Sequence, residues 1–84
     1  MPVWKLTPTD LADTAWKTSR HRGPAIVRAA SEGAARRVTA LAFRVGEAPS
    51  SEQPWTKPAL VKAEQIEDAR YDAAGQSAVL DPAG

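Results

Sequence analysis

The strongest pattern of apolar and polar positions lies between Ser31 and Gly46. At 100° per residue, one set of apolar side chains falls within an arc of roughly 120°. The set is Ala34, Ala35, Val38, Leu41, Ala42 and Val45. Ser31 is a favoured N-cap, Glu32 places a negative charge in the first turn, and Gly46 is a typical stop. The pattern predicts an amphipathic helix of about four turns, with Phe43 about 140° from the centre of its apolar stripe.

Three shorter segments have the residue types of β-strands. Val3–Leu6 contains Val, Trp and Leu, which suit a pleated, half-buried surface. Ala25–Ala30 places small residues on one face, where a helix can pack closely, and Arg28 on the other. The third segment, Leu60–Ile66, changes phase along its length, which a frayed edge or a bulge near Gln65 would explain.

The order of these elements predicts an α+β fold. A small three-stranded sheet carries the long helix on one face, in the order β-β-α-β. The helix-containing connection is right-handed if the strands it joins are parallel. A short extra helix is expected near residues 8–16, because Thr7 fits an N-cap and Pro8 fits the first helical position. An extended turn with Trp16 as a plug fits the same residues.

Length and composition limit the class of protein. The 84 residues suffice for one domain with a thin core, expected over residues 1–72, with a poorly ordered tail over 73–84. The absence of cysteine excludes disulfides and thiolate metal sites. The sequence has neither a signal-peptide pattern at its start nor the run of about 20 apolar residues that crosses a membrane. We expect a cytoplasmic protein, monomeric or weakly dimeric through an exposed sheet edge.

The net charge of +1 hides an uneven distribution. Residues 1–46 hold eight basic and three acidic side chains, for +5, whereas residues 47–84 hold three and seven, for −4. The split predicts either a basic surface for an acidic partner or a fold in which the acidic half neutralises the basic half. Because Lys and Arg neutralise phosphates, weak nucleic-acid binding is one hypothesis. Its candidate residues are Lys17, Arg20, Arg22 and Arg28.

Few residues suggest catalysis. His21 is the only histidine, it stands in a basic loop, and nothing in the sequence orients a serine or a carboxylate toward it. The carboxylates fit caps, strand surfaces and strand ends, and the chain lacks a glycine-rich phosphate loop. We therefore expect a non-enzymatic protein with no catalytic residues, no metal site and no cofactor.

The aromatic residues suggest a protein-binding role. The chain has five large rings: Trp4, Trp16, Phe43, Trp55 and Tyr71. They are many for so small a core, and Phe43 lies outside its helix's apolar stripe. Trp55 either folds over Phe43, or both stay exposed beside Arg36 as an aromatic–arginine patch of the kind enriched at interfaces. The sequence thus favours a small protein-binding or adaptor domain with an unidentified protein partner.

Several short segments also carry a resemblance. They are VWKLTPTDL, Trp16 followed by Ser19, GPAIVRAASEGAAR, and PWTKPALV with the acidic IED after it. Together they cover most of residues 3–68 and resemble a family of short, uncharacterised bacterial proteins, a domain of unknown function. The resemblance implies a small cytoplasmic bacterial domain. It implies no particular activity and no catalytic residues.

Overall fold

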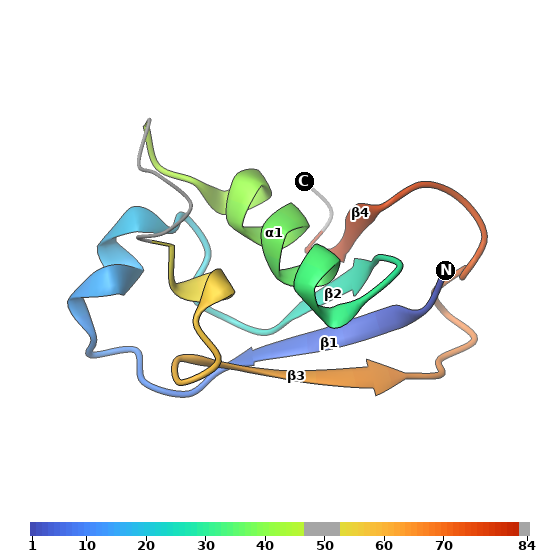
Figure 1. Ribbon diagram of the computed structural model, residues 1–84, viewed down its shortest axis with the longest axis horizontal. Helices are drawn as coiled ribbons and strands as arrows, with labels where there is room; N and C mark the ends of the chain where they lie inside the picture. Colours follow the sequence, from blue (N-terminus) through green and yellow to red (C-terminus); the bar gives the residue numbers. More distant parts are fainter. Residues whose placement is uncertain (47–52, 83–84) are drawn as a thin grey trace.

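The computed structural model describes residues 1–46 and 53–82, which form a four-stranded antiparallel sheet with one α-helix across one face (Figure 1). The strands are β1 (Val3–Pro8), β2 (Ala25–Arg28), β3 (Val61–Ile66) and β4 (Ala78–Asp81). The helices are α1 (Glu32–Phe43) and two short 3₁₀ segments, η1 (Thr14–Thr18) and η3 (Pro54–Thr56). The predicted α+β class with a helix on one sheet face is confirmed, but the sheet has four strands, not three.

The strand order is β3-β1-β2-β4. Since β1 is antiparallel to both of its neighbours, β2 and β3 run in the same direction on either side of it, and α1 lies in the connection between them. The pairing of β1 with β3 is regular from Val3↔Ile66 to Pro8↔Val61, so of the two explanations offered for the change of phase, a bulge near Gln65 is excluded. The irregularity lies instead between β2 and β4.

The strand β4 corrects the prediction of a poorly ordered tail over residues 73–84, of which residues 83 and 84 lie outside the described part of the chain. Its residues pair with β2, with Val79 opposite Val27, and Val79 packs against the core. The strand was missed because only two neighbouring large apolar residues, Val79 and Leu80, mark it among small and polar ones. The predicted boundary at residue 72 is therefore wrong, since the sheet includes residues 78–81.

The helix α1 begins as predicted and ends earlier than predicted. The Ser31 side chain accepts the backbone N–H of Ala34, which satisfies one of the free donors of the first turn. The helix spans 12 residues and ends at Phe43 rather than near Gly46. It ends there because Arg44 forms an isolated β-bridge with Ser19, which draws the chain away from the helix axis.

The buried face of α1 is not the predicted stripe. Its buried residues are Ala35, Arg36, Thr39, Ala40 and Phe43. Leu41 and Val45, which belonged to the predicted stripe, are 62% and 44% exposed. The true face is rotated from the predicted one by roughly 130°, which brings Phe43 to its middle. Because alanines occur on all sides of this helix, they do not distinguish its buried face. The larger residues Leu41 and Val45 therefore determined which face was predicted to be buried, and both are exposed.

The segment after β1 also differs from its prediction. β1 continues to Pro8, and the helical turns come later, in η1, where Asp13 accepts the backbone N–H of Ala15 as an N-cap. A short helix is therefore present near the predicted residues 8–16, but it begins at Thr14, and the predicted Thr7 cap and Pro8 start are wrong because both residues belong to β1. Trp16 is 1% exposed, as expected for a plug beneath this segment.

The connection from β3 to β4 passes around the end of the sheet where β1 begins (Figure 1). The Met1 amino group donates to the carbonyl of Ala73, and the Tyr71 hydroxyl donates to the Asp81 carboxylate at 3.4 Å. Asp81 lies opposite Ile26, whose side chain is on the sheet face away from α1. The connection therefore reaches across to this second face.

Candidate functional site

Phe43 lies in an aromatic cluster at the C-terminal end of α1. Its ring centroid is 5.6 Å from that of Trp55 and 4.9 Å from that of His21, and 9% of the residue stays exposed. Trp55 is fully buried, packs edge-on against Trp16 at 5.3 Å, and donates its indole N–H to the Ser19 hydroxyl at 2.9 Å. The alternative in which Trp55 folds over Phe43 is thus confirmed.

Arg36 is buried as well, with 7% exposure. Its guanidinium donates to the carbonyl oxygens of Val61 at 2.9 Å and Trp55 at 3.4 Å, and to the Glu32 carboxylate at 3.4 Å. The hypothesis that Arg36 belongs to an exposed patch is wrong because the buried face of α1 is rotated and includes Arg36. The predicted binding patch of Phe43, Trp55 and Arg36 is likewise not a surface, since all three residues belong to the interior.

The four predicted nucleic-acid-binding residues divide into two groups. Three are exposed in or just after η1, near the C-terminal end of α1: Lys17, Arg20 and Arg22. The fourth, Arg28, lies at the end of β2, where its guanidinium donates to the carbonyls of Asp72 at 2.9 Å and Gln76 at 2.7 Å. A Cβ at Gly75 (φ 118°) would be 2.8 Å from this guanidinium. Arg28 therefore holds the loop before β4 and is apart from the other three.

The ion pairs of the structure are local. Among residues 1–46 and 53–82 they are Arg36–Glu32, at 3.4 Å within one helix, and Arg70–Asp68, at 2.7 Å within one loop. Neither joins the basic half of the chain to the acidic half. Within the described residues, the interpretation that the acidic half neutralises the basic half gains no support.

Arg20 lies against the end of α1. Its backbone N–H donates to the carbonyl of Phe43 and its guanidinium donates to the carbonyl of Ala42, both at 2.7 Å. These carbonyls belong to the last turn, which has no helical donors, and a cation there interacts favourably with the helix dipole. A guanidinium has five N–H donors, so this bond to Ala42 leaves Arg20 with the capacity to bind a further acceptor.

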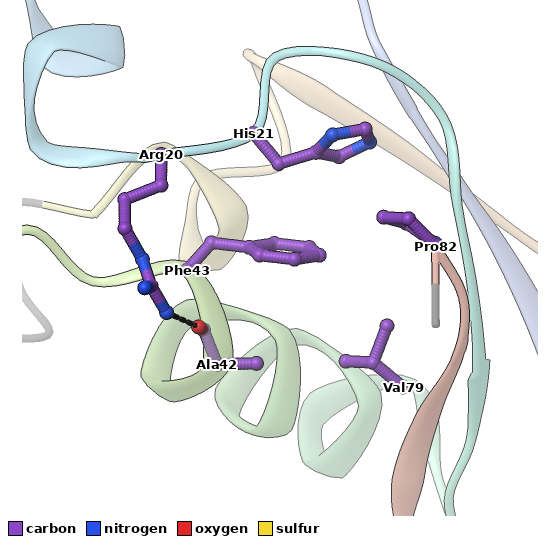
Figure 2. A pocket seen from close by; sticks show the side chains of 6 residues that line it. All are labelled: Arg20, His21, Ala42, Phe43, Val79 and Pro82. Atoms are coloured by element: carbon purple, nitrogen blue, oxygen red, sulfur yellow. Dashed lines mark hydrogen bonds between the residues drawn. The ribbon is translucent and has the colours of Figure 1, made fainter. Parts of the chain in front are cut away.

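A groove of about 460 Å³ opens between α1 and β4 (Figure 2). Its lining residues are Arg20, His21, Ala42, Phe43, Val79 and Pro82. The walls from α1 and β4 are apolar, whereas Arg20 and His21 enter from the loop after η1. His21 is oriented by a 3.1 Å contact between its Nε2 atom and the carbonyl of Pro24. The groove falls in the size range of small-ligand sites, about 300–1,000 Å³.

Sequence reasoning singled out part of this groove, but for other roles. Arg20 was a candidate for phosphate binding and Phe43 for an exposed patch, and the groove brings these two residues together. Ala42, Val79 and Pro82 were not identified as groove residues from the sequence, because nothing in the chemistry of these side chains indicates a binding site. The available signal was the position of Phe43 outside the predicted stripe.

Comparison with protein-family models, with curated proteins and with solved structures gives no match to this chain. The resemblance to a bacterial family therefore stays a prediction. In the part of the chain that the structure describes, no three His, Asp or Glu side chains are grouped to hold a metal ion. The helices of residues 1–46 and 53–82 are all too short or too polar to cross a bilayer.

Proposed function

We propose that this protein is a small non-enzymatic binding domain whose binding surface is the groove between α1 and β4. The observation behind the proposal is the composition of that groove: apolar walls from Ala42, Phe43 and Val79, with Arg20 and His21 on one side. Binding sites in general combine mostly apolar walls with a few placed polar groups. The six lining residues include no carboxylate or hydroxyl beside His21, which favours binding over acid–base catalysis.

A protein partner suits this groove because the groove is open to the surface and lies next to an edge strand of the sheet. The groove lies on the surface beside an edge strand, where a segment of another chain can lie along it. Phe43 lines the groove although only 9% of the residue is exposed, and an aromatic residue in a well-packed cluster is of the kind on which binding energy concentrates.

The proposal is tested by selecting displayed random peptides of about eight residues on the purified domain and titrating the selected peptides by NMR. We expect the largest amide shifts at groove residues. Ala42→Trp fills the groove and should weaken binding at least tenfold. Leu41→Trp is the matched control, because the adjacent Leu41 is 62% exposed and does not line the groove. Selection of no peptide, or equal binding by both variants, contradicts the proposal.

Weak nucleic-acid binding is a second candidate function. It is favoured by the position of Arg44, which pairs with Ser19 and so adds a fourth exposed cation to Lys17, Arg20 and Arg22. Such binding would weaken steeply as salt rises from about 20 mM to about 200 mM.

The two functions are separable by a double variant, Lys17→Glu with Arg22→Glu, which removes two cations and leaves the groove lining intact. Fluorescence anisotropy with labelled single-stranded RNA and duplex DNA measures the effect. Binding that is absent at low salt, or unaffected by salt, rules out this second function.

A further inference from the structure

The groove lies beside a sheet edge. β4 is the last strand in the order β3-β1-β2-β4 and pairs with β2 on one side. In the described residues, no strand pairs with its other side. An unpaired edge presents backbone N–H and C=O groups to which another extended chain can add. β4 has four residues and an irregular register with β2, which limits any added strand to a short segment.

The opposite edge is less suited to such addition. There, Arg36 already donates to the carbonyl of Val61, and η3 packs between β3 and α1. The strand itself alternates exposed charged residues, Lys62 and Glu64, with partly buried ones. Charges along an edge are a device that opposes strand addition.

A strand added to β4 would present alternate side chains to the groove. Side chains alternate between the two faces of a strand, and neighbouring strands lie about 4.8 Å apart. Val79 projects from β4 to the helix side of the sheet and forms one wall of the groove (Figure 2). A side chain on the same face of the added strand would therefore lie next to Val79 and could contact Phe43.

The charge around the groove selects the chemistry of that strand. Arg20 lines the groove with its guanidinium on the Ala42 carbonyl, and His21 lines it as well (Figure 2), while Arg22 and Arg44 are exposed nearby. Within the described residues, the carboxylates lie more than 4.0 Å from these arginines, since the ion pairs there involve only Arg36 and Arg70. Exposed cations attract an anionic ligand over distances of about 10 Å.

We propose that the groove binds an extended segment of a partner protein that carries a bulky apolar residue two positions from an aspartate or glutamate, so that both side chains lie on the groove face. The segment pairs with the outer edge of β4, its apolar side chain lies between Phe43 and Val79, and its carboxylate accepts hydrogen bonds from Arg20. This inference rests on the proposed function and specifies the class of partner.

The test uses the peptides selected on the wild-type domain, synthesised with blocked ends. We expect them to share an acidic residue two positions from a large apolar one. Replacing the acid by its amide should weaken binding roughly five- to tenfold, because a charge-assisted hydrogen bond is lost. Arg20→Gln should cause a similar loss, whereas Arg22→Gln, on the same loop but outside the groove lining, should change binding less than about twofold.

Exchanging the charges of Arg20 and the peptide acid distinguishes a lost contact from a variant that fails to fold, because only a folded variant can bind the charge-reversed peptide. Arg20→Glu should bind a lysine-containing version of the peptide better than the acidic original. N-methylation of alternate peptide amides should weaken binding if the peptide pairs with β4. Peptides that bind at the groove without any dependence on their carboxylate overturn this inference and leave the proposed function standing. Peptides that bind elsewhere, or not at all, overturn the proposed function itself.

Discussion

Two arginines hold the two edges of the sheet by the same chemistry in different surroundings. Arg36, on α1, donates to the carbonyls of Trp55 and Val61 beside β3. Arg28, at the end of β2, donates to two carbonyls in the loop that leads to β4. Neither forms its main contacts with a carboxylate. The difference is burial, because the bonds of Arg36 to these carbonyls are buried whereas those of Arg28 are exposed.

Burial determines what each arginine contributes. When a buried donor is removed, the carbonyls that it served lose their partner without gaining water, which costs about 1–3 kcal/mol for each group. When an exposed donor is removed, water takes its place. The β3 edge is therefore firmly held, whereas the β4 edge is held by replaceable bonds. This contrast agrees with a binding groove beside β4 rather than beside β3.

Replacing Arg36 by Met should have the largest effect on stability. The variant keeps most of the apolar stem but leaves the carbonyls of Trp55 and Val61 without their donor. We expect a loss of about 3 kcal/mol in the free energy of unfolding, measured by urea denaturation. Arg37→Met, one residue along and exposed, should stay within about 0.5 kcal/mol of wild type. Equal stability of the two variants would show that the buried bonds contribute little.

Replacing Ser19 by Ala should have the second-largest effect. Ser19 is 3% exposed, and its hydroxyl accepts the indole N–H of Trp55 and donates to the carbonyl of His21. Its loss leaves a buried N–H without a partner, which costs about 2 kcal/mol. Thermal unfolding by circular dichroism measures the change, with Ser77→Ala as the exposed control. A Ser19→Ala variant as stable as this control would be inconsistent with the assigned bond.

Replacing Arg28 by Met is the same substitution as Arg36→Met, made at the β4 edge, where the hydrogen bonds are exposed. It should lower the free energy of unfolding by about 1 kcal/mol or less. The effect should be local instead. Amide hydrogen exchange over residues 72–77 should accelerate, because the guanidinium no longer holds the carbonyls of Asp72 and Gln76. A loss of global stability equal to that of Arg36→Met would remove the distinction between the two edges.

The sequence predicted the fold class because its strongest local signals agree with the tertiary structure. Ser31 and Glu32 mark the start of α1 correctly, and β1, β2 and β3 lie where their residue types predicted. The face of α1 was misjudged for a physical reason. Counting only apolar residues treats Arg36 as polar surface, whereas its buried guanidinium satisfies backbone carbonyls. A buried arginine of this kind is identified by its partners, which a helical wheel does not include.

The groove was less predictable than the fold. Its lining comes from three separate segments, the loop after η1, the end of α1, and β4. Their proximity depends on the placement of β4 beside β2, and β4 itself was missed. Phe43 was recognised as unusual, but for the opposite reason: it lies near the middle of the buried face and only its edge reaches the groove. A site built at the meeting of distant segments depends on topology more than on residue type.

The smallest expected effect comes from a third arginine, which pairs with a carboxylate at the surface. Hydrogen bonds from the Arg70 side chain and backbone, with its charge, lower the pKa of Asp68 from 3.8 to about 2. A lowered pKa gives stability that is present above pH 3.8 and is lost as the pH falls toward 2. Because the pair lies at the surface, water and salt screen it, so Arg70→Gln should lower the unfolding midpoint at pH 7 only slightly. It should, however, return the Asp68 pKa toward 3.8, as measured by carboxyl NMR. A wild-type Asp68 titrating near 3.8 would contradict this pairing. The expected result would show that a guanidinium paired with a carboxylate at the surface stabilises this domain less than a guanidinium hydrogen-bonded to buried carbonyls.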